Sequence, residues 1–185
     1  NNLEFDHADI FDDLAMIQRQ FHHLVRTVPA SGRLIVPARD TALEEVLAMG
    51  AWTPNETFGL EGGADWQLEA ECPDHSRFQV LRQGARVGTV NWGLVGRHNA
   101  ANALAALAAA AHAGVDPALG VQALGDFRNV KRRLELRGEV GGVRVYDDFA
   151  HHPTAIRLTL DGLRQQVGSQ RIIAILEPRS NSMRM

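Results

Sequence analysis

Lysine and cysteine are both scarce in this sequence, and each shortage excludes a class of site. The 185 residues contain a single lysine, Lys131, whereas arginine is common. A phosphate-binding loop of the G-x-x-x-x-G-K-[ST] type needs a lysine directly after glycine, but Lys131 follows Val130. The single cysteine, Cys72, excludes a disulfide within the chain and a zinc site built from several cysteines. The printed sequence therefore contains no phosphate-binding loop of this type.

A strong charge imbalance and a long apolar run are also missing. The formal net charge is -3 at pH 7, so the chain lacks the basic footprint that predicts nucleic-acid binding. No apolar run is long enough to span a membrane and no signal peptide is recognisable, so no membrane partner is predicted. Apolar residues make up 45 % and charged residues 22 %, as in ordinary water-soluble proteins. With the single cysteine, these features predict a reducing, cytoplasmic location.

Helical and strand patterns alternate along the first two thirds of the chain, which predicts an α/β fold. Apolar residues at helical spacing predict an amphipathic helix at 10–28, and β-rich segments flank Gln83 and Gly84, which suit a turn. A change of character near residue 127 predicts a boundary between a part at 1–127 and a part at 128–185. The elements expected before this boundary are helix 10–28, strand 34–36, a helix to about residue 49 opened by a capping box at Thr41 and Glu44, and strands within 66–71 and 78–90. An alanine-rich helix is expected after Gly96, to about residue 113, and a short helix that starts at Asp116 and Pro117 is expected to run to residue 127.

The part after residue 127 has the pattern of a β-α-β unit. Two strands are expected around Gly141 and Gly142, followed by a helix at 155–167 for which Thr154 is the expected N-cap. The apolar run at 172–176 is typical of a parallel strand that is covered on both faces. Because the carboxyl ends of parallel strands meet at one edge, the polar loops at 147–152 and 177–181 are predicted to share a crevice.

Polar residues stand at the start of the alanine-rich helix. Asn99 suits an N-cap, because its side-chain oxygen can accept from the first unpaired N–H groups. Asn102 lies one turn further on, and its amide offers both a donor and an acceptor, the pair that an adenine edge requires. A doubly capped helix without a ligand is the alternative interpretation, and this stretch alone leaves both open.

Four segments, in this order, resemble motifs of the Mur ligases, the ATP-dependent amide-bond-forming enzymes of peptidoglycan synthesis. Any one of them is a weak signal, whereas four in the family's order are specific, and together they extend over almost the whole chain. They are residues 2–7 (N-L-E-F-D-H), residues 96–106 (G-R-H-N-A-A-N-A-L-A-A), residues 132–135 (R-R-L-E) and residues 147–154 (D-D-F-A-H-H-P-T), with Phe149 where the family has tyrosine.

The resemblance implies a parent of three domains, of which this sequence holds two parts. The expected fold is α/β, with the later part of a central ATPase domain and its mixed sheet at 1–127. The start of a Rossmann-like carboxyl-terminal domain follows at 128–185. The expected cofactors are ATP and Mg²⁺. Without a phosphate-binding loop, this fragment alone is expected to be inactive.

The resemblance also implies roles for individual residues. His7 matches the histidine that binds magnesium, although a neutral imidazole is an unusual ligand for so hard a cation. Asn102 is expected to contact adenine, with His98 and Asn99 shaping the pocket. Arg133, with Arg132 as the alternative, is expected to donate bidentate hydrogen bonds to phosphate. The remaining expected site residues are Asp148, which would accept from the ribose or organise the crevice, His151 and His152, which would line it, and Arg179, Ser180 and Asn181, which would face the substrate.

The form of the 147–154 motif resembles the branch of the family that acts directly on UDP-N-acetylmuramate. The loop at 177–183 and the opening at 1–11 resemble the members that add the tripeptide L-Ala-γ-D-Glu-meso-diaminopimelate in peptidoglycan recycling. Addition of L-alanine is the alternative within the same branch. Two readings without catalysis stay open as well, a nucleotide-binding module and a structural remnant. The expected partners are UDP-N-acetylmuramate and the murein tripeptide.

Overall fold

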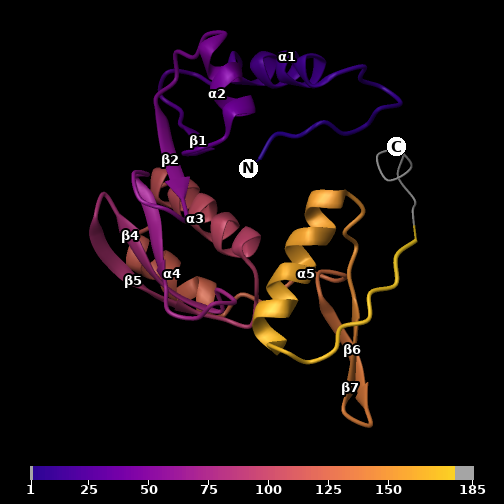
Figure 1. The fold of residues 1–185 in the computed structure, drawn as a ribbon. Helices are drawn as coiled ribbons and strands as arrows, with labels where there is room; N and C mark the ends of the chain where they lie inside the picture. The colour runs from indigo at the N-terminus through magenta and orange to yellow at the C-terminus, as the bar shows by residue number, and fades with distance from the viewer. Residues whose placement is uncertain (1, 178–185) are drawn as a thin grey trace.

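A five-stranded mixed sheet forms the centre of the amino-terminal part of the molecule. The computed structural model describes residues 2–177. Strands β1 to β5 lie in sequence order, with β1–β2 and β2–β3 parallel and β3–β4 and β4–β5 antiparallel (Figure 1). We call residues 2–127 the first lobe. The strands are β1 (Leu34–Pro37), β2 (Asn55–Gly59), β3 (Trp66–Ala70), β4 (Arg77–Arg82) and β5 (Ala85–Asn91).

The first two helices begin where short acidic side chains cap them. Helix α1 (Leu14–Val25) starts after Asp13, whose carboxylate accepts from the N–H of Met16 at 2.8 Å. The expected start at residue 10 was wrong, because this cap binds the first free N–H groups further along. Helix α2 (Thr41–Ala48) is capped by Asp40 rather than by Thr41. In both helices a carboxylate provides the cap, as helix N-termini prefer.

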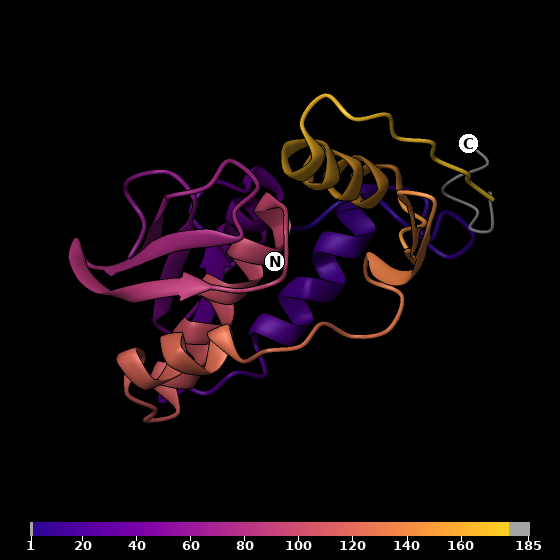
Figure 2. The same cartoon turned by 90° about the horizontal axis from the view of Figure 1, so that it is seen from below.

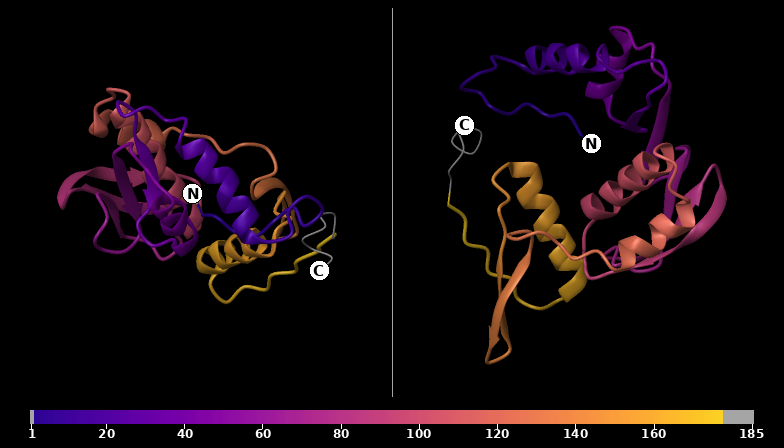
Figure 3. Two further views of the ribbon diagram at one scale, coloured as in Figure 1. Left: turned by 90° about the horizontal axis from the view of Figure 1, so that it is seen from above. Right: turned by 180° about the vertical axis from the view of Figure 1, so that it is seen from behind.

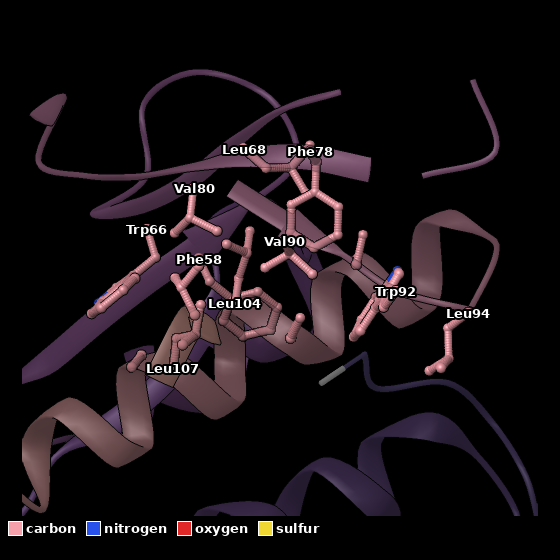
Figure 4. Packing of buried hydrophobic residues seen from close by; sticks show 14 residues of the cluster. Phe58, Trp66, Leu68, Phe78, Val80, Val90, Trp92, Leu94, Leu104 and Leu107 are labelled. Carbon is pink, nitrogen blue, oxygen red and sulfur yellow. The ribbon is translucent and has the colours of Figure 1, made fainter. Parts of the chain in front are cut away.

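The main core lies between the sheet and two helices, α3 (Arg97–His112) and α4 (Pro117–Gly125). Trp66, Phe78 and Leu104 are fully buried, and Figure 4 shows Phe78 and Leu104 inside the cluster. The small residues Ala100, Ala103 and Ala108 on α3 let the helix approach the strands closely. Burying each large apolar side chain contributes roughly 1.5–3 kcal/mol. The amino end of α3, at the edge of this core, is therefore held rigidly.

The carboxyl-terminal part is small and consists of a hairpin and one helix. We call residues 128–177 the second lobe. Strands β6 (Glu135–Val140) and β7 (Val143–Asp147) pair antiparallel around Gly141 and Gly142, both at positive φ, as a tight hairpin turn requires. Helix α5 (Pro153–Val167) follows, and Figures 1 and 3 show it between the hairpin and the first lobe.

The predicted strand at 172–176 does not form. These residues have no regular secondary structure, and the side chains of Ile173 and Ile175 are 70 % and 93 % exposed. A strand needs a hydrogen-bonded neighbour, and β6 and β7 pair only with each other in the part of the chain that the structure describes. The expected β-α-β unit is therefore present only as β7 and α5.

Helix α5 packs on the start of α3 through two glycines. A Cβ atom at Gly162 would lie 2.9 Å from the Cα of Gly96, closer than real Cβ contacts come. The two backbones therefore touch only because neither residue carries a side chain. Figure 2 shows α5 from another side, beside the first lobe. Within residues 2–177, no helix has the length and apolar character to cross a membrane.

Candidate functional site

A cavity of about 1280 Å³ lies where the two lobes meet. Its wall is built from the amino-terminal segment, the start of α3, the segment before β6, the end of β7 and the start of α5. Segments that are distant in the sequence thus converge, as expected for a ligand site. The expected site residues in its wall are His98, Asn99, Asn102, Arg133, Asp148 and His152.

Helix α3 enters the cavity wall through Gly96. This residue is the N-cap, at φ 95°, and no side chain caps the helix. The predicted cap, Asn99, lies within the first turn instead, and its Nδ2 donates to the carbonyl oxygen of Val95 at 2.8 Å. The prediction was wrong because glycine adopts the positive φ that starts the helix three residues earlier. Asn99 thus holds the approach to α3 in place while it lines the cavity.

The imidazole of His98 rests against Gly96. A Cβ atom at Gly96 would lie 2.9 Å from Cε1 of His98, so only glycine leaves room for the ring. Nδ1 of His98 is buried and has no hydrogen-bond partner among the described residues. Burial lowers the pKa of His98, the nearby Asp148 carboxylate opposes this shift, and Arg133 adds to it. His98 is therefore held neutral, with the accessible nitrogen, Nε2, as the site for its proton.

Asn102 lies one turn further along α3 and is exposed. It lines the cavity on the same side as His98 and Asn99. Its amide can offer a donor and an acceptor together. The position therefore fits the expected contact with a base edge, which stays a prediction.

Asp148 organises the entry to the second lobe. One carboxylate oxygen accepts from the N–H of Leu134 and the other from the N–H of Ala150, both at 2.7 Å. These bonds tie the end of β7 to the segment before β6. Of the two roles expected for Asp148, organising the crevice is therefore the one that the geometry supports.

The two neighbouring arginines have different surroundings. Arg132 lies 3.3 Å from the carboxylate of Asp147 through Nε, and its guanidinium stacks 4.9 Å from the centroid of the Phe149 ring. Arg133 is exposed and lines the cavity, and no ion pair holds it within residues 2–177. A guanidinium without an ion-pair partner is available to an anionic ligand. The geometry favours Arg133 over Arg132 as the arginine that faces a ligand.

The two adjacent histidines also separate. His152 is the N-cap of α5, and its Nδ1 accepts from the N–H of Thr154 at 3.3 Å, so Thr154 is not the cap that the sequence predicted. His151 is exposed and is absent from the cavity wall. Its ring lies edge-on to Phe149, with 5.1 Å between the centroids. Both histidines were predicted to line the crevice, and of the two only His152 lies in the cavity wall.

The structure offers little support for a metal site. His7 has φ 55°, and its side chain is 67 % exposed and 4.0 Å from the carboxylate of Asp6. No group of three or more histidine, cysteine, aspartate or glutamate residues gathers for a metal within residues 2–177. Because Mg²⁺ in nucleotide sites is usually held by one or two protein groups together with phosphates and water, His7 as a ligand stays a prediction.

Two features of the site had no signal in the sequence. The hydrogen bond between Glu4 and Thr154 and the contact between Gly96 and Gly162 both join distant segments. Neither has a local pattern, because pairs of this kind depend on how the lobes pack. The expected substrate residues, Arg179, Ser180 and Asn181, lie outside the described residues, so their predicted position beside Asp148 is untested.

Both lobes match known protein families. The family model for the Mur ligase middle domain matches residues 1–110, and the model for the Mur ligase glutamate ligase domain matches residues 132–184. The Escherichia coli K12 ligase for UDP-N-acetylmuramate and L-alanyl-γ-D-glutamyl-meso-2,6-diaminoheptandioate is 59 % identical over 100 % of this chain and 40 % of its own length. The UDP-N-acetylmuramate–L-alanine ligase of Rubrobacter xylanophilus is 38 % identical over 98 % of this chain and 40 % of its own.

A solved structure agrees with these matches. The crystal structure of a murein peptide ligase from Psychrobacter arcticus superimposes with a TM-score of 0.70 and 46 % identity, covering 92 % of this chain and 36 % of that one. The chain thus spans about two fifths of the length of the curated relatives it matches. The predicted α/β class and family are confirmed. By the matched middle domain, the motifs and the shared fold, the chain belongs to the Mur ligase family.

Proposed function

We propose that this chain forms the ATP-binding junction of a ligase that joins UDP-N-acetylmuramate to L-alanyl-γ-D-glutamyl-meso-diaminopimelate. Mur ligases depend on ATP and generally require Mg²⁺. The observation that carries the proposal is the cavity between the lobes, where His98, Asn102 and Arg133 converge from both matched domains. The 59 % identity to a ligase of this specificity supports the choice of substrates.

The proposed reaction has two steps. The carboxylate of UDP-N-acetylmuramate attacks the γ-phosphorus of ATP, ADP leaves, and an acyl phosphate forms. The amine of the tripeptide then attacks the acyl carbon, phosphate leaves, and the nitrogen loses a proton as the amide forms. The protein contributes positioning and neutralisation of charge. A bound Mg²⁺ would supply further neutralisation of the phosphate charge.

Each cavity residue has a role that its chemistry supports. Asn102 would pair with the adenine edge through its amide donor and acceptor. Arg133 would donate two parallel hydrogen bonds to phosphate oxygens from across the junction. His98, held neutral, would offer its Nε2–H to the ligand without adding charge. Asp148 would keep Arg133 in place through its bond to the N–H of Leu134.

Binding of ATP to the chain separates this proposal from the readings without catalysis. ATP should raise the unfolding temperature of the 185-residue chain, whereas a structural remnant would show no shift. GTP should bind more weakly, because a base contact of this kind discriminates by about 1–3 kcal/mol, roughly 5- to 150-fold in affinity. Equal binding of ATP and GTP would contradict the adenine contact.

Addition of L-alanine is the second candidate, since the Rubrobacter xylanophilus relative that matches 98 % of the chain is a UDP-N-acetylmuramate–L-alanine ligase. Its identity of 38 % is well below 59 %. The tripeptide is therefore the substrate that the comparisons favour, and turnover with each amine in a full-length ligase that contains this chain distinguishes the two.

A further inference from the structure

Residues that are far apart in the sequence meet at the start of α5. The hydroxyl of Thr154 donates to Oε2 of Glu4 at 2.6 Å. Next to it, Nε2 of His152 lies 3.3 Å from the carbonyl oxygen of Phe5. Glu4, His152 and Thr154 are all partly buried and all line the cavity. The amino-terminal segment of the first lobe is thus bonded to the helix of the second lobe at the site itself.

These bonds define the state of His152. Its Nδ1 accepts from the N–H of Thr154 at 3.3 Å, so this nitrogen carries no proton. In that tautomer Nε2 donates to the carbonyl oxygen of Phe5, and Nδ1 also lies 3.7 Å from Oε2 of Glu4. Thr154 therefore makes two bonds here. Its backbone N–H holds the His152 ring, and its hydroxyl holds Glu4.

A second contact, at Gly162, also holds α5 against the first lobe. Gly162 lies against Gly96 further along α5. Eight residues separate it from Thr154, about 12 Å at the rise of an α-helix. The contact at Gly162 is steric and packed, whereas the contact at Thr154 is a hydrogen bond. Residues of α5 between the two, among them Ala155 and Thr159, line the cavity.

We propose that Thr154 is a positioning residue for the site. Its hydrogen bond to Glu4 holds the amino end of α5 on the first lobe and so fixes His152 in the cavity wall. Without this bond, α5 stays attached at Gly162 while its amino end moves away from the first lobe. The identity of the ligand that His152 would contact rests on the proposed function. The position of α5 does not, because it is measurable without any ligand.

The experiment measures the distance between the lobes in the full 185-residue chain. Spin labels at Gln122→Cys on α4 and Arg157→Cys on α5, in a Cys72→Ser background, report it by pulsed electron paramagnetic resonance. Both label positions are exposed. The background chain should give one narrow distribution. Thr154→Val, which keeps the shape but removes the hydroxyl, should broaden it toward longer distances.

Four variants make the result specific. Thr154→Ser restores a hydroxyl and should restore the narrow distribution. Glu4→Met should broaden the distribution at least as much as Thr154→Val, because it removes the same bond and also the carboxylate that lies 3.7 Å from Nδ1 of His152. The double variant should be no broader than Glu4→Met alone. Thr27→Val is the matched control, since the Thr27 hydroxyl donates to Leu24 within the first lobe at 2.7 Å and its loss should leave the distance unchanged.

Three outcomes would overturn the inference: a broad distribution in the background chain, an unchanged one in both Thr154→Val and Glu4→Met, or a Thr154→Ser distribution as broad as that of Thr154→Val. If Thr154→Val does not fold, as circular dichroism would show, Glu4→Met decides alone. All distances are taken without nucleotide. A failure to bind ATP would therefore count against the proposed function and leave this test unaffected.

Discussion

His98 shows how one side chain can be prepared for a ligand by its neighbours. Gly96 leaves room for the ring, and burial leaves Nδ1 without a partner in the described part of the chain. An unpaired lone pair is less costly in such a place than a charged ring, so the neutral form is favoured. The sequence motif indicated that His98 shapes the pocket. The protonation state could not be predicted from it, because it depends on Gly96, Arg133 and Asp148 in space.

The first prediction concerns the titration of His98. Burial lowers the pKa of His98 in the folded chain below its ordinary value of 6.5. Just below pH 6.5, therefore, the unfolded chain takes up a proton at His98 while the folded chain stays neutral there. The contribution of His98 to stability is therefore complete above pH 6.5 and is lost as the pH falls through the folded pKa. Nitrogen-15 NMR should show a midpoint below 6.5 and a proton on Nε2. A midpoint above 6.5 would contradict this account.

Asn102 gives the second prediction. Replacing Asn102 with alanine leaves a desolvated base edge unpaired, at a cost on the order of 1–3 kcal/mol. In a full-length ligase that contains this chain, the dissociation constant of ATP, measured by titration calorimetry, should rise roughly 5- to 150-fold. Asn91→Ala is the control, because Asn91 is exposed at the end of β5 and absent from the cavity wall. Equal affinities for the two variants would remove Asn102 from the adenine contact.

At the scale of whole elements, local patterns predicted well and pairings across the chain did not. The hairpin of β4 and β5 was predicted, because Gln83 and Gly84 adopt the positive φ that its turn requires. Strand β2 was missed, since only Phe58 is buried in it and no alternation marks it. The run at 172–176 has the composition of a buried strand, yet composition cannot supply a neighbouring strand.

Helix starts were also predicted where the cap is local and missed where it depends on distant residues. Asp116 and Pro117 predicted α4 correctly, because the cap and the first residue act within one turn. At α3 and α5 the expected caps, Asn99 and Thr154, were wrong. There, Gly96 and His152 begin the helices, and both are held by contacts with distant parts of the chain.

The third prediction tests the packing of α5. Without a neighbour, Gly162→Ala would stabilise a helix by about 1 kcal/mol. Here the new Cβ atom would meet backbone atoms of Gly96 at 2.9 Å and 3.1 Å, so the helix must move. We expect a net loss of about 1–3 kcal/mol in the free energy of unfolding, measured by urea denaturation. Gly125→Ala in α4, where the Cβ atom finds ordinary contact at 3.5 Å, should not destabilise the chain.

On the scale of the whole molecule, the site belongs to the junction and not to either lobe. His98 and Asn102 come from the first lobe, whereas Arg133, Asp148 and His152 come from the second. The sequence predicted these residues through family motifs, but it could not place them relative to one another. The cavity arises because Gly162 and Thr154 seat α5 on the first lobe.

The fourth prediction is that this chain alone does not ligate. The printed sequence has no phosphate-binding loop, and it spans about two fifths of the length of its curated relatives. Incubation with ATP, Mg²⁺, UDP-N-acetylmuramate and tripeptide should release no phosphate above the level without enzyme. Turnover in that assay would show that the printed sequence suffices for the reaction.

The last prediction concerns the amine that a full-length ligase containing this chain accepts. L-alanine is small and presents one carboxylate, whereas the tripeptide is longer and carries several, so it requires more donors. The segment 177–181, which the sequence predicts as a loop, contains Arg179, which can hold a carboxylate through two hydrogen bonds, with Ser180 and Asn181 as neutral donors. A site built around these bonds leaves them unpaired when L-alanine binds, and such discrimination reaches about 10⁴ or more. We therefore expect kcat/KM for the tripeptide to exceed that for L-alanine by a large factor, at saturating ATP and UDP-N-acetylmuramate. Arg179→Lys, which keeps the charge but not the paired donors, should reduce this ratio, and a ratio in favour of L-alanine would assign the chain to the alanine-adding ligases instead.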